Sequence, residues 1–199
     1  MAASQTIMSL SDNQLDEVIK LLTPLDSKID KRVQYAMTQF NMAKNEALEY
    51  IVTDNPILWA KVYLDWEARD YQFAILTEGK KSKKLVLRLG RRLGKTDDMC
   101  VLILWFAYTQ YNKGPNNQYD IIIATPYETQ IDLIFKRLHQ LIEVSPLLGG
   151  LISRDVHHNI CFNINGVTSN ILGLTAGANN ATGGANSTRG QRADVIILD

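Results

Sequence analysis

Apolar residues recur at three-and-four spacing through the first third of the chain, which is the pattern of helices with one buried face. A first helix is predicted over residues 11–23, since the proline that follows lacks the N–H for the next helical hydrogen bond. A second helix is predicted over residues 26–51, and a third over residues 57–76, after the break at Asn55-Pro56. We therefore expect residues 1–54 to form a helical N-terminal segment that serves packing or docking rather than chemistry.

Further along the chain, short β-rich runs alternate with helical patterns. Buried strands are predicted over residues 85–89, 120–124 and 195–198. Buried or amphipathic helices are predicted over residues 95–111 and 131–142. Strands that alternate with helices usually form a parallel sheet through right-handed crossovers. The expected fold class is therefore α/β, with a parallel sheet flanked by helices.

Two segments of the C-terminal third have the composition of turns and loops. Asn165-Gly166 stands between alternating apolar positions and predicts a tight hairpin, because both residue types tolerate positive φ. Residues 174–192 are rich in Gly, Ala, Asn, Ser and Thr. That composition is typical of a loop beside a ligand rather than of a packed element.

The central chemical motif follows the strand predicted over residues 85–89 and reads Gly90-Arg91-Arg92-Leu93-Gly94-Lys95-Thr96. In a P-loop, main-chain N–H groups at a helix N-terminus hold phosphate oxygens, a lysine reaches the β and γ phosphates, and a hydroxyl ligates Mg²⁺. Lys95 and Thr96 are the residue types that this chemistry needs. The spacing departs from GxxxxGK[ST], because Leu89 stands where the first glycine is expected and Gly90 comes one place late.

Two further features give this motif a context. Asp199 ends the last predicted strand, and in P-loop ATPases an aspartate in that place holds Mg²⁺. Upstream, Tyr71 could stack on an adenine ring, and the Gln72 amide offers a donor and an acceptor to its edge, although the two could also be an ordinary helix pair. The sequence thus predicts ATP and Mg²⁺ as ligands. The expected nucleotide contacts are Tyr71, Gln72, Gly90, Arg91, Arg92, Leu93, Gly94, Lys95 and Thr96, with Thr96 and Asp199 at the metal.

The succession RDYQ, GRRLGKT, IIIATPYETQ and RGQRADVIILD resembles the ATPase domain of the large terminase subunits of tailed bacteriophages. The match covers residues 55–199. It implies a P-loop NTPase domain of the RecA-like, ASCE type, preceded by the helical segment. It also implies an ATPase that drives double-stranded viral DNA into a procapsid from the host cytoplasm, docked on the portal. Its expected partners are the portal protein, the small terminase subunit and further copies in a ring, with no membrane.

The resemblance also implies roles for arginines. In that family the deviant P-loop carries an arginine proposed to contact the γ phosphate, which here is Arg91 by first choice, or Arg92. Arg189 stands where some members offer an arginine to a neighbouring subunit's ATP, and a loop ion pair with Asp194 is the equally weighted alternative. Phosphoryl transfer spreads charge over the γ-phosphate oxygens, so positioned cations carry much of the catalysis. The expected catalytic residues are Lys95, Arg91, Asp199 and Arg189.

Several family features are missing from the sequence as given. The glutamate that normally follows the aspartate, the later coupling motif and the nuclease domain are absent. We therefore expect residues 1–199 to bind ATP weakly and to hydrolyse it poorly alone. Two alternatives remain open. One is a helicase-like DNA-dependent ATPase, which also combines an upstream glutamine with a P-loop, and the other is a nucleotide-binding adaptor without turnover.

Composition adds little to these expectations. The 21 Lys and Arg equal the 21 Asp and Glu, so whole-chain charge gives no argument for binding nucleic acid. A local patch would be needed, and the lysine run over residues 80–84 is more simply a solvated loop than a phosphate contact. The longest apolar stretch is far shorter than the roughly 20 residues that span a bilayer.

The cysteines and the adjacent histidines are expected to have structural roles. Cys100 and Cys161 lie in apolar runs without metal-ligand spacing, which favours packing as small hydrophobes. His157 and His158 have no Cys or acidic neighbours at ligand spacing in the sequence, so they are expected to be surface residues beside a strand.

Overall fold

The computed structural model describes residues 7–90, 93–113, 117–175 and 192–199. The chain forms two compact units, one of residues 1–98 with 144–147, and one of residues 99–143 with 148–199. The first unit thus extends well past the expected division between residues 54 and 55. Placing an ATPase domain at residues 55–199 stays a prediction.

Helices make up the first unit. They are the 3₁₀ turn η1 (Ile7–Ser9), α1 (Asp12–Leu22), α2 (Ile29–Phe40), α3 (Lys44–Asp54), α4 (Pro56–Leu64) and α5 (Asp70–Lys81). Local signals start two of them: the main chain of Ser11 donates to Gln14 Oε1 (2.9 Å) at the start of α1, and Asn55 Oδ1 accepts from the Ile57 N–H (2.9 Å) at the start of α4. Pro56 then occupies the first position of α4, where its missing N–H costs nothing.

Two of the predicted helices are each divided in the structure. The predicted helix over residues 26–51 is two helices, because Asn41 adopts a left-handed conformation (φ 52°) after α2. The predicted helix over residues 57–76 divides in the same way at Asp65 (φ 47°). Asn and Asp tolerate this conformation better than most residues, so the chain can turn at each break. The helices before and after the break can then each bury their own apolar face.

The connection between α5 and α6 is not the predicted strand. Residues 85–89 have no strand pairing, and Val86 is 91% exposed. A strand needs a hydrogen-bonded neighbour, and within the described residues this segment has none in the sheet. The prediction of a sheet strand directly before the glycine motif is therefore wrong for this structure.

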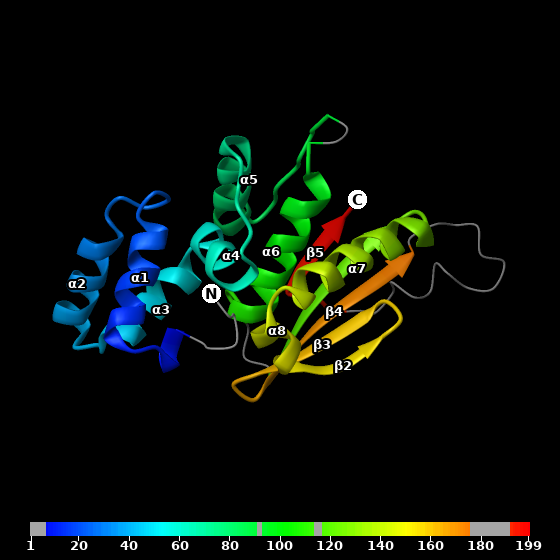
Figure 1. Cartoon of the computed structure of the whole chain (residues 1–199). Helices are drawn as coiled ribbons and strands as arrows, with labels where there is room; N and C mark the ends of the chain where they lie inside the picture. Colours follow the sequence, from blue (N-terminus) through cyan, green and yellow to red (C-terminus); the bar gives the residue numbers. More distant parts are fainter. Residues whose placement is uncertain (1–6, 91–92, 114–116, 176–191) are drawn as a thin grey trace. The chain divides into compact units, whose positions relative to one another are not determined.

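The second unit carries the sheet. Its elements are most of α6 (Lys95–Thr109), β1 (Gln118–Thr125), α7 (Glu128–Glu143), most of α8 (Pro146–Leu151), β2 (Ile152–Val156), β3 (Asn159–Ile164), β4 (Val167–Thr175) and β5 (Val195–Leu198). The strand order is β2-β3-β4-β1-β5 (Figure 1). β1 is parallel to β4 and β5, whereas β2, β3 and β4 are antiparallel neighbours. The fold is thus α/β as predicted, but its sheet is mixed rather than parallel, because two tight hairpins add antiparallel strands.

One face of the sheet is covered by helices. On β4, Ser169 Oγ donates to the carbonyl of Ala107 in α6 (2.8 Å). Four residues later, a Cβ on Gly173 would lie 2.5 Å from Ile131 Cγ2 of α7. Because alternate residues of a strand share a face, α6 and α7 cover the same side of β4. The opposite face is more open, and on β5 it carries Ile196 (64% exposed) and Leu198 (78% exposed).

Several local predictions are confirmed. The helix over residues 95–109 and the strands β1 and β5 lie where their apolar patterns placed them. Asn165 (φ 53°) and Gly166 (φ 79°) form the two-residue turn between β3 and β4, and both cysteines are buried and not part of a disulfide. No helix in the described part of the chain is long and apolar enough to cross a membrane.

Candidate functional site

The turn that leads into α6 is centred on Gly94. Gly94 has φ 75°, and its carbonyl accepts the Asp98 N–H (3.0 Å), so α6 begins at Lys95 directly after it. A Cβ at Gly94 would lie 3.2 Å from Gln72 Nε2. Glycine is therefore favoured here both by the backbone conformation and by the close approach of α5.

The structure brings the two upstream candidates onto this turn. Tyr71 and Gln72 stand in the first turn of α5, and the Tyr71 hydroxyl donates to the Leu93 carbonyl (2.8 Å). Arg69 Nη1 lies 3.4 Å from the same hydroxyl. All of these residues belong to the first unit. Two motifs that are separated in the sequence thus form one local cluster around Gly94.

Gln72 is a buried brace in this cluster. Its side chain is 4% exposed, its Oε1 accepts the Arg69 main-chain N–H (2.8 Å), and its Nε2 donates to Asp98 Oδ1. Both ends of the amide are therefore engaged, one at the start of α5 and one in the first turn of α6. Contact between Gln72 and an adenine edge would require this brace to open, and that contact stays a prediction.

Asp98 is the most perturbed carboxyl group of the cluster. It is fully buried, and its Oδ2 has no hydrogen-bond partner among the described residues. Burial raises its pKa from the usual 3.8 to about 6, the hydrogen bond from Gln72 and the charge of Arg69 oppose the rise, and the charge of Asp97 adds to it. A buried carboxyl group beside a glycine turn was not predicted, and the signal for it was only its position one turn into the helix.

The other predicted site residues are distributed as follows. Lys95 and Thr96 are the first two residues of α6, both half-buried, while Gly90 and Leu93 are exposed. Asp199 follows β5 in the second unit, with its main-chain N–H 3.3 Å from the Ala124 carbonyl. A shared metal at Thr96 and Asp199 stays a prediction. The predicted arginines lie outside the described residues; they are Arg91, Arg92 and Arg189.

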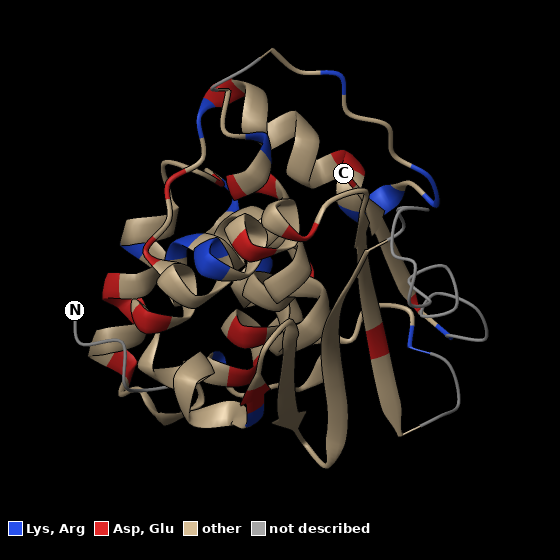
Figure 2. Ribbon diagram, turned by 90° about the vertical axis from the view of Figure 1, so that its right-hand side faces the viewer, with Lys and Arg blue, Asp and Glu red and all other residues tan. Residues whose placement is uncertain are grey.

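The basic segment lies next to this cluster in the sequence. Figure 2 shows Lys and Arg along the chain that links α5 to α6. Lys80 bonds to Asp54 (2.6 Å), so it serves the packing of the first unit. Lys83, Lys84 and Arg88 are exposed. Exposed cations before the turn are compatible with a phosphate ligand, but equally with a solvated loop.

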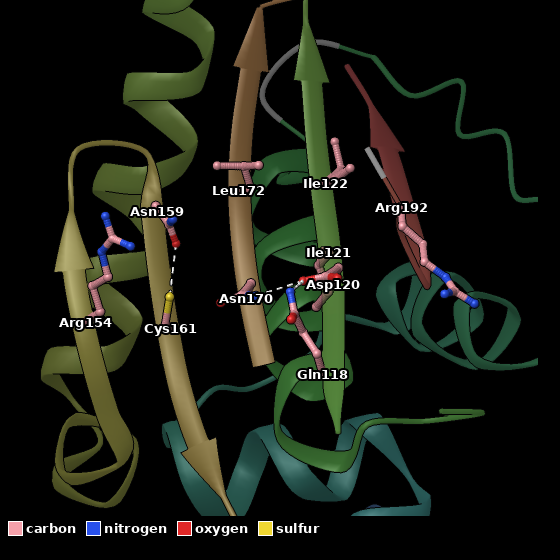
Figure 3. Close-up of a pocket in the computed structure, with 10 residues that line it drawn as sticks. All are labelled: Gln118, Asp120, Ile121, Ile122, Arg154, Asn159, Cys161, Asn170, Leu172 and Arg192. Carbon is pink, nitrogen blue, oxygen red and sulfur yellow. Dashed lines mark hydrogen bonds between the residues drawn. The ribbon is translucent and has the colours of Figure 1, made fainter. Parts of the chain in front are cut away.

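A second hollow lies on the open face of the sheet (Figure 3), with a volume of about 500 Å³. Its floor is organised by Asp120 of β1, whose Oδ1 accepts from Gln118 Nε2 (2.7 Å) and Asn170 Nδ2 (2.8 Å). This hollow lies beside the first half of β1, whereas ligands of open α/β sheets bind beyond the carboxyl ends of the strands. Asp120 Oδ1 is thus engaged by side chains of the sheet itself.

No model of a known protein family matches the chain, and no curated protein matches it. The arrangement around Gly94 and the motifs themselves are therefore what supports a functional proposal.

Proposed function

We propose that this chain is the nucleotide-binding part of a DNA-packaging motor ATPase of the large-terminase type. The observation that supports it best is the contact of Tyr71 and Gln72 with the Gly94 turn, from which α6 begins at Lys95. Three separate parts of a nucleotide site, namely an aromatic ring, a glycine turn and a lysine at a helix start, then lie together in one unit. A Gly-Lys-Thr sequence that occurs by chance would not be expected to lie beside both an aromatic ring and a turn of this kind.

The residues at the turn suit a triphosphate. The first N–H groups of a helix have no acceptor within the helix, and they and the positive helix end favour phosphate oxygens. Lys95 supplies a cation at this end of α6, and the Thr96 hydroxyl is a hard oxygen ligand of the kind that Mg²⁺ takes. Bound ATP and Mg²⁺ would supply the reactive phosphoanhydride. The chain would position it, with Asp199 as the second metal contact and Arg91 and Arg189 as cations.

The two alternatives differ from this proposal in measurable ways. A helicase-like ATPase would show hydrolysis stimulated by single-stranded DNA, whereas a packaging motor acts on double-stranded DNA. An adaptor would bind ATP stoichiometrically and release no phosphate, with or without DNA. We expect weak ATP binding and poor hydrolysis from residues 1–199 alone.

The decisive test is ATP binding with Mg²⁺, measured by isothermal titration calorimetry on wild type, Lys95→Ala and a control, Lys31→Ala. Lys31 is an exposed lysine of α2 in the same unit, so the control removes the same charge elsewhere. A charge-assisted hydrogen bond is worth about 1.5–3 kcal/mol, so Lys95→Ala should weaken binding about 10- to 150-fold. Lys31→Ala should leave the affinity unchanged.

Circular dichroism of both variants shows whether the first unit remains folded. If wild type binds no ATP, or if Lys95→Ala and Lys31→Ala bind it equally well, the Gly94 turn is not a phosphate site. Robust hydrolysis stimulated by DNA in residues 1–199 would contradict the expectation of weak activity.

A further inference from the structure

A cluster of metal-ligating side chains lies in the second unit, between α7 and the turn that joins β2 to β3. Donor atoms of Glu128, His157 and His158 all lie within 4.8 Å of one another. A fourth group, Asp132, stands one helical turn after Glu128 on α7, with its Oδ1 2.7 Å from His158 Nε2 and 3.8 Å from His157 Nε2. No acidic residue at ligand spacing accompanies the histidines in the sequence, but the fold brings two carboxylates to them.

The turn holds His158 firmly in place. His158 has φ 56°, which is uncommon for a residue other than glycine, and its side chain is only 13% exposed. Its ring packs 5.5 Å from that of Phe135, and its carbonyl accepts the Gly173 N–H (2.8 Å). The backbone hydrogen bond and the ring packing therefore fix where the His158 imidazole lies.

The two imidazole rings lie close together. The ring centroids of His157 and His158 are 3.7 Å apart, with 36° between the planes. Two carboxylates approach them from α7: Glu128 with a donor atom within 4.8 Å, and Asp132 by direct contact with both rings. Ring nitrogens and carboxylate oxygens thus gather at one place, as the ligands of a metal ion do.

We propose that Glu128, His157 and His158 bind a divalent transition-metal ion of the zinc class. Two imidazole nitrogens and one carboxylate are a frequent Zn²⁺ ligand set, with water completing the coordination. Tetrahedral bonds of about 2.0–2.1 Å place donor atoms about 3.3 Å apart, so small side-chain rotations from the present separations suffice. Asp132 is the carboxylate that receives the His158 N–H and orients the ring.

The test is Zn²⁺ binding to untagged protein at neutral pH, measured by calorimetry and by the visible absorption of bound Co²⁺. The variants are His157→Gln, Glu128→Gln and His158→Asn, in which asparagine tolerates the left-handed turn. The control is His139→Gln, because His139 bonds to Asp155 between α7 and β2 in a similar way but has no second imidazole beside it.

Wild type should bind one equivalent. Outer-sphere partners of metal sites are worth about 10- to 100-fold in affinity, so loss of a direct ligand should cost at least that much. His139→Gln should bind like wild type.

The proposal is overturned if wild type binds Zn²⁺ no better than the variants, or if His139→Gln weakens binding as much as His157→Gln. Glu128→Gln changes an exposed side chain and keeps the turn intact, so its result stands even if His158→Asn destabilises the fold. This site is independent of ATP binding at the Gly94 turn.

Discussion

Replacing Asp98 with Asn should change how the stability of the protein depends on pH. The pKa of Asp98 is raised from 3.8 to about 6, chiefly by burial. A raised pKa means that the folded state holds a proton more tightly than the unfolded state does. The group therefore contributes its full stability below pH 3.8, and that contribution is lost as the pH rises through about 6.

The size of the effect follows from the difference between the two pKa values of Asp98. One pKa unit is worth about 1.4 kcal/mol, so the interval from 3.8 to about 6 corresponds to about 3 kcal/mol of unfolding free energy. In Asp98→Asn the amide oxygen can still accept the hydrogen bond from Gln72 Nε2, but no proton is exchanged. The variant should thus gain stability relative to wild type, by up to about 3 kcal/mol, as the pH rises from about 4 to about 7.

The measurement is urea unfolding, followed by tryptophan fluorescence at a series of pH values, for wild type, Asp98→Asn and Asp30→Asn. Asp30 is an exposed carboxylate of α2, so its replacement controls for loss of one negative charge. Trp59 is fully buried in the first unit and reports on its unfolding. If the pH dependence of Asp98→Asn matches that of wild type, Asp98 does not titrate in this range and the reasoning is wrong.

Two further substitutions test the packing around the sheet and the glycine turn. Gly173→Ala places a Cβ 2.5 Å from Ile131 Cγ2 and 2.9 Å from Phe135 Cε2, so the free energy of unfolding should fall by about 1–3 kcal/mol, as measured by thermal unfolding. Adding Ile131→Ala to the same chain should restore part of this loss. An unchanged melting temperature for Gly173→Ala would contradict the close packing of α7 on β4. Tyr71→Phe removes the hydrogen bond to the Leu93 carbonyl and should lower stability by about 1 kcal/mol in urea unfolding, whereas equal stability would show that this contact contributes nothing.

Local sequence patterns predicted those elements whose structure is fixed locally. The apolar run of α6, the β-branched residues of β1 and β5, and the Asn165-Gly166 turn each contain their own signal, and each lies where it was predicted. The helix breaks at Asn41 and Asp65 were missed, because a left-handed residue other than glycine leaves little trace in a hydrophobic pattern.

The errors concern contacts between distant residues. Residues 85–89 have the apolar composition of a strand, but a strand forms only where a partner is in register, which no local pattern can supply. The mixed sheet has the same origin, since the hairpin of β3 and β4 determines strand direction. At the candidate site, Tyr71 and Leu93 were both expected to lie near the nucleotide, but neither their direct contact nor the burial of Asp98 was inferred.

Only part of the metal-ligating cluster has a signal in the sequence. Glu128 and Asp132 are four residues apart on the polar side of α7, which is a readable spacing for two ligands on one helix face. Their approach to His157 and His158, however, depends on how α7 packs against β4 through Gly173. That packing is a property of the whole unit, so the four residues could not be joined from sequence alone.

The bare side of β5 has a practical consequence. Ile196 and Leu198 are large, apolar and mostly open to water, and within the described residues the strand pairs only with β1. Excluding water from such a side chain yields about 1.5–3 kcal/mol. At high protein concentration, molecules should therefore associate along β5. Samples for the experiments above are best kept dilute.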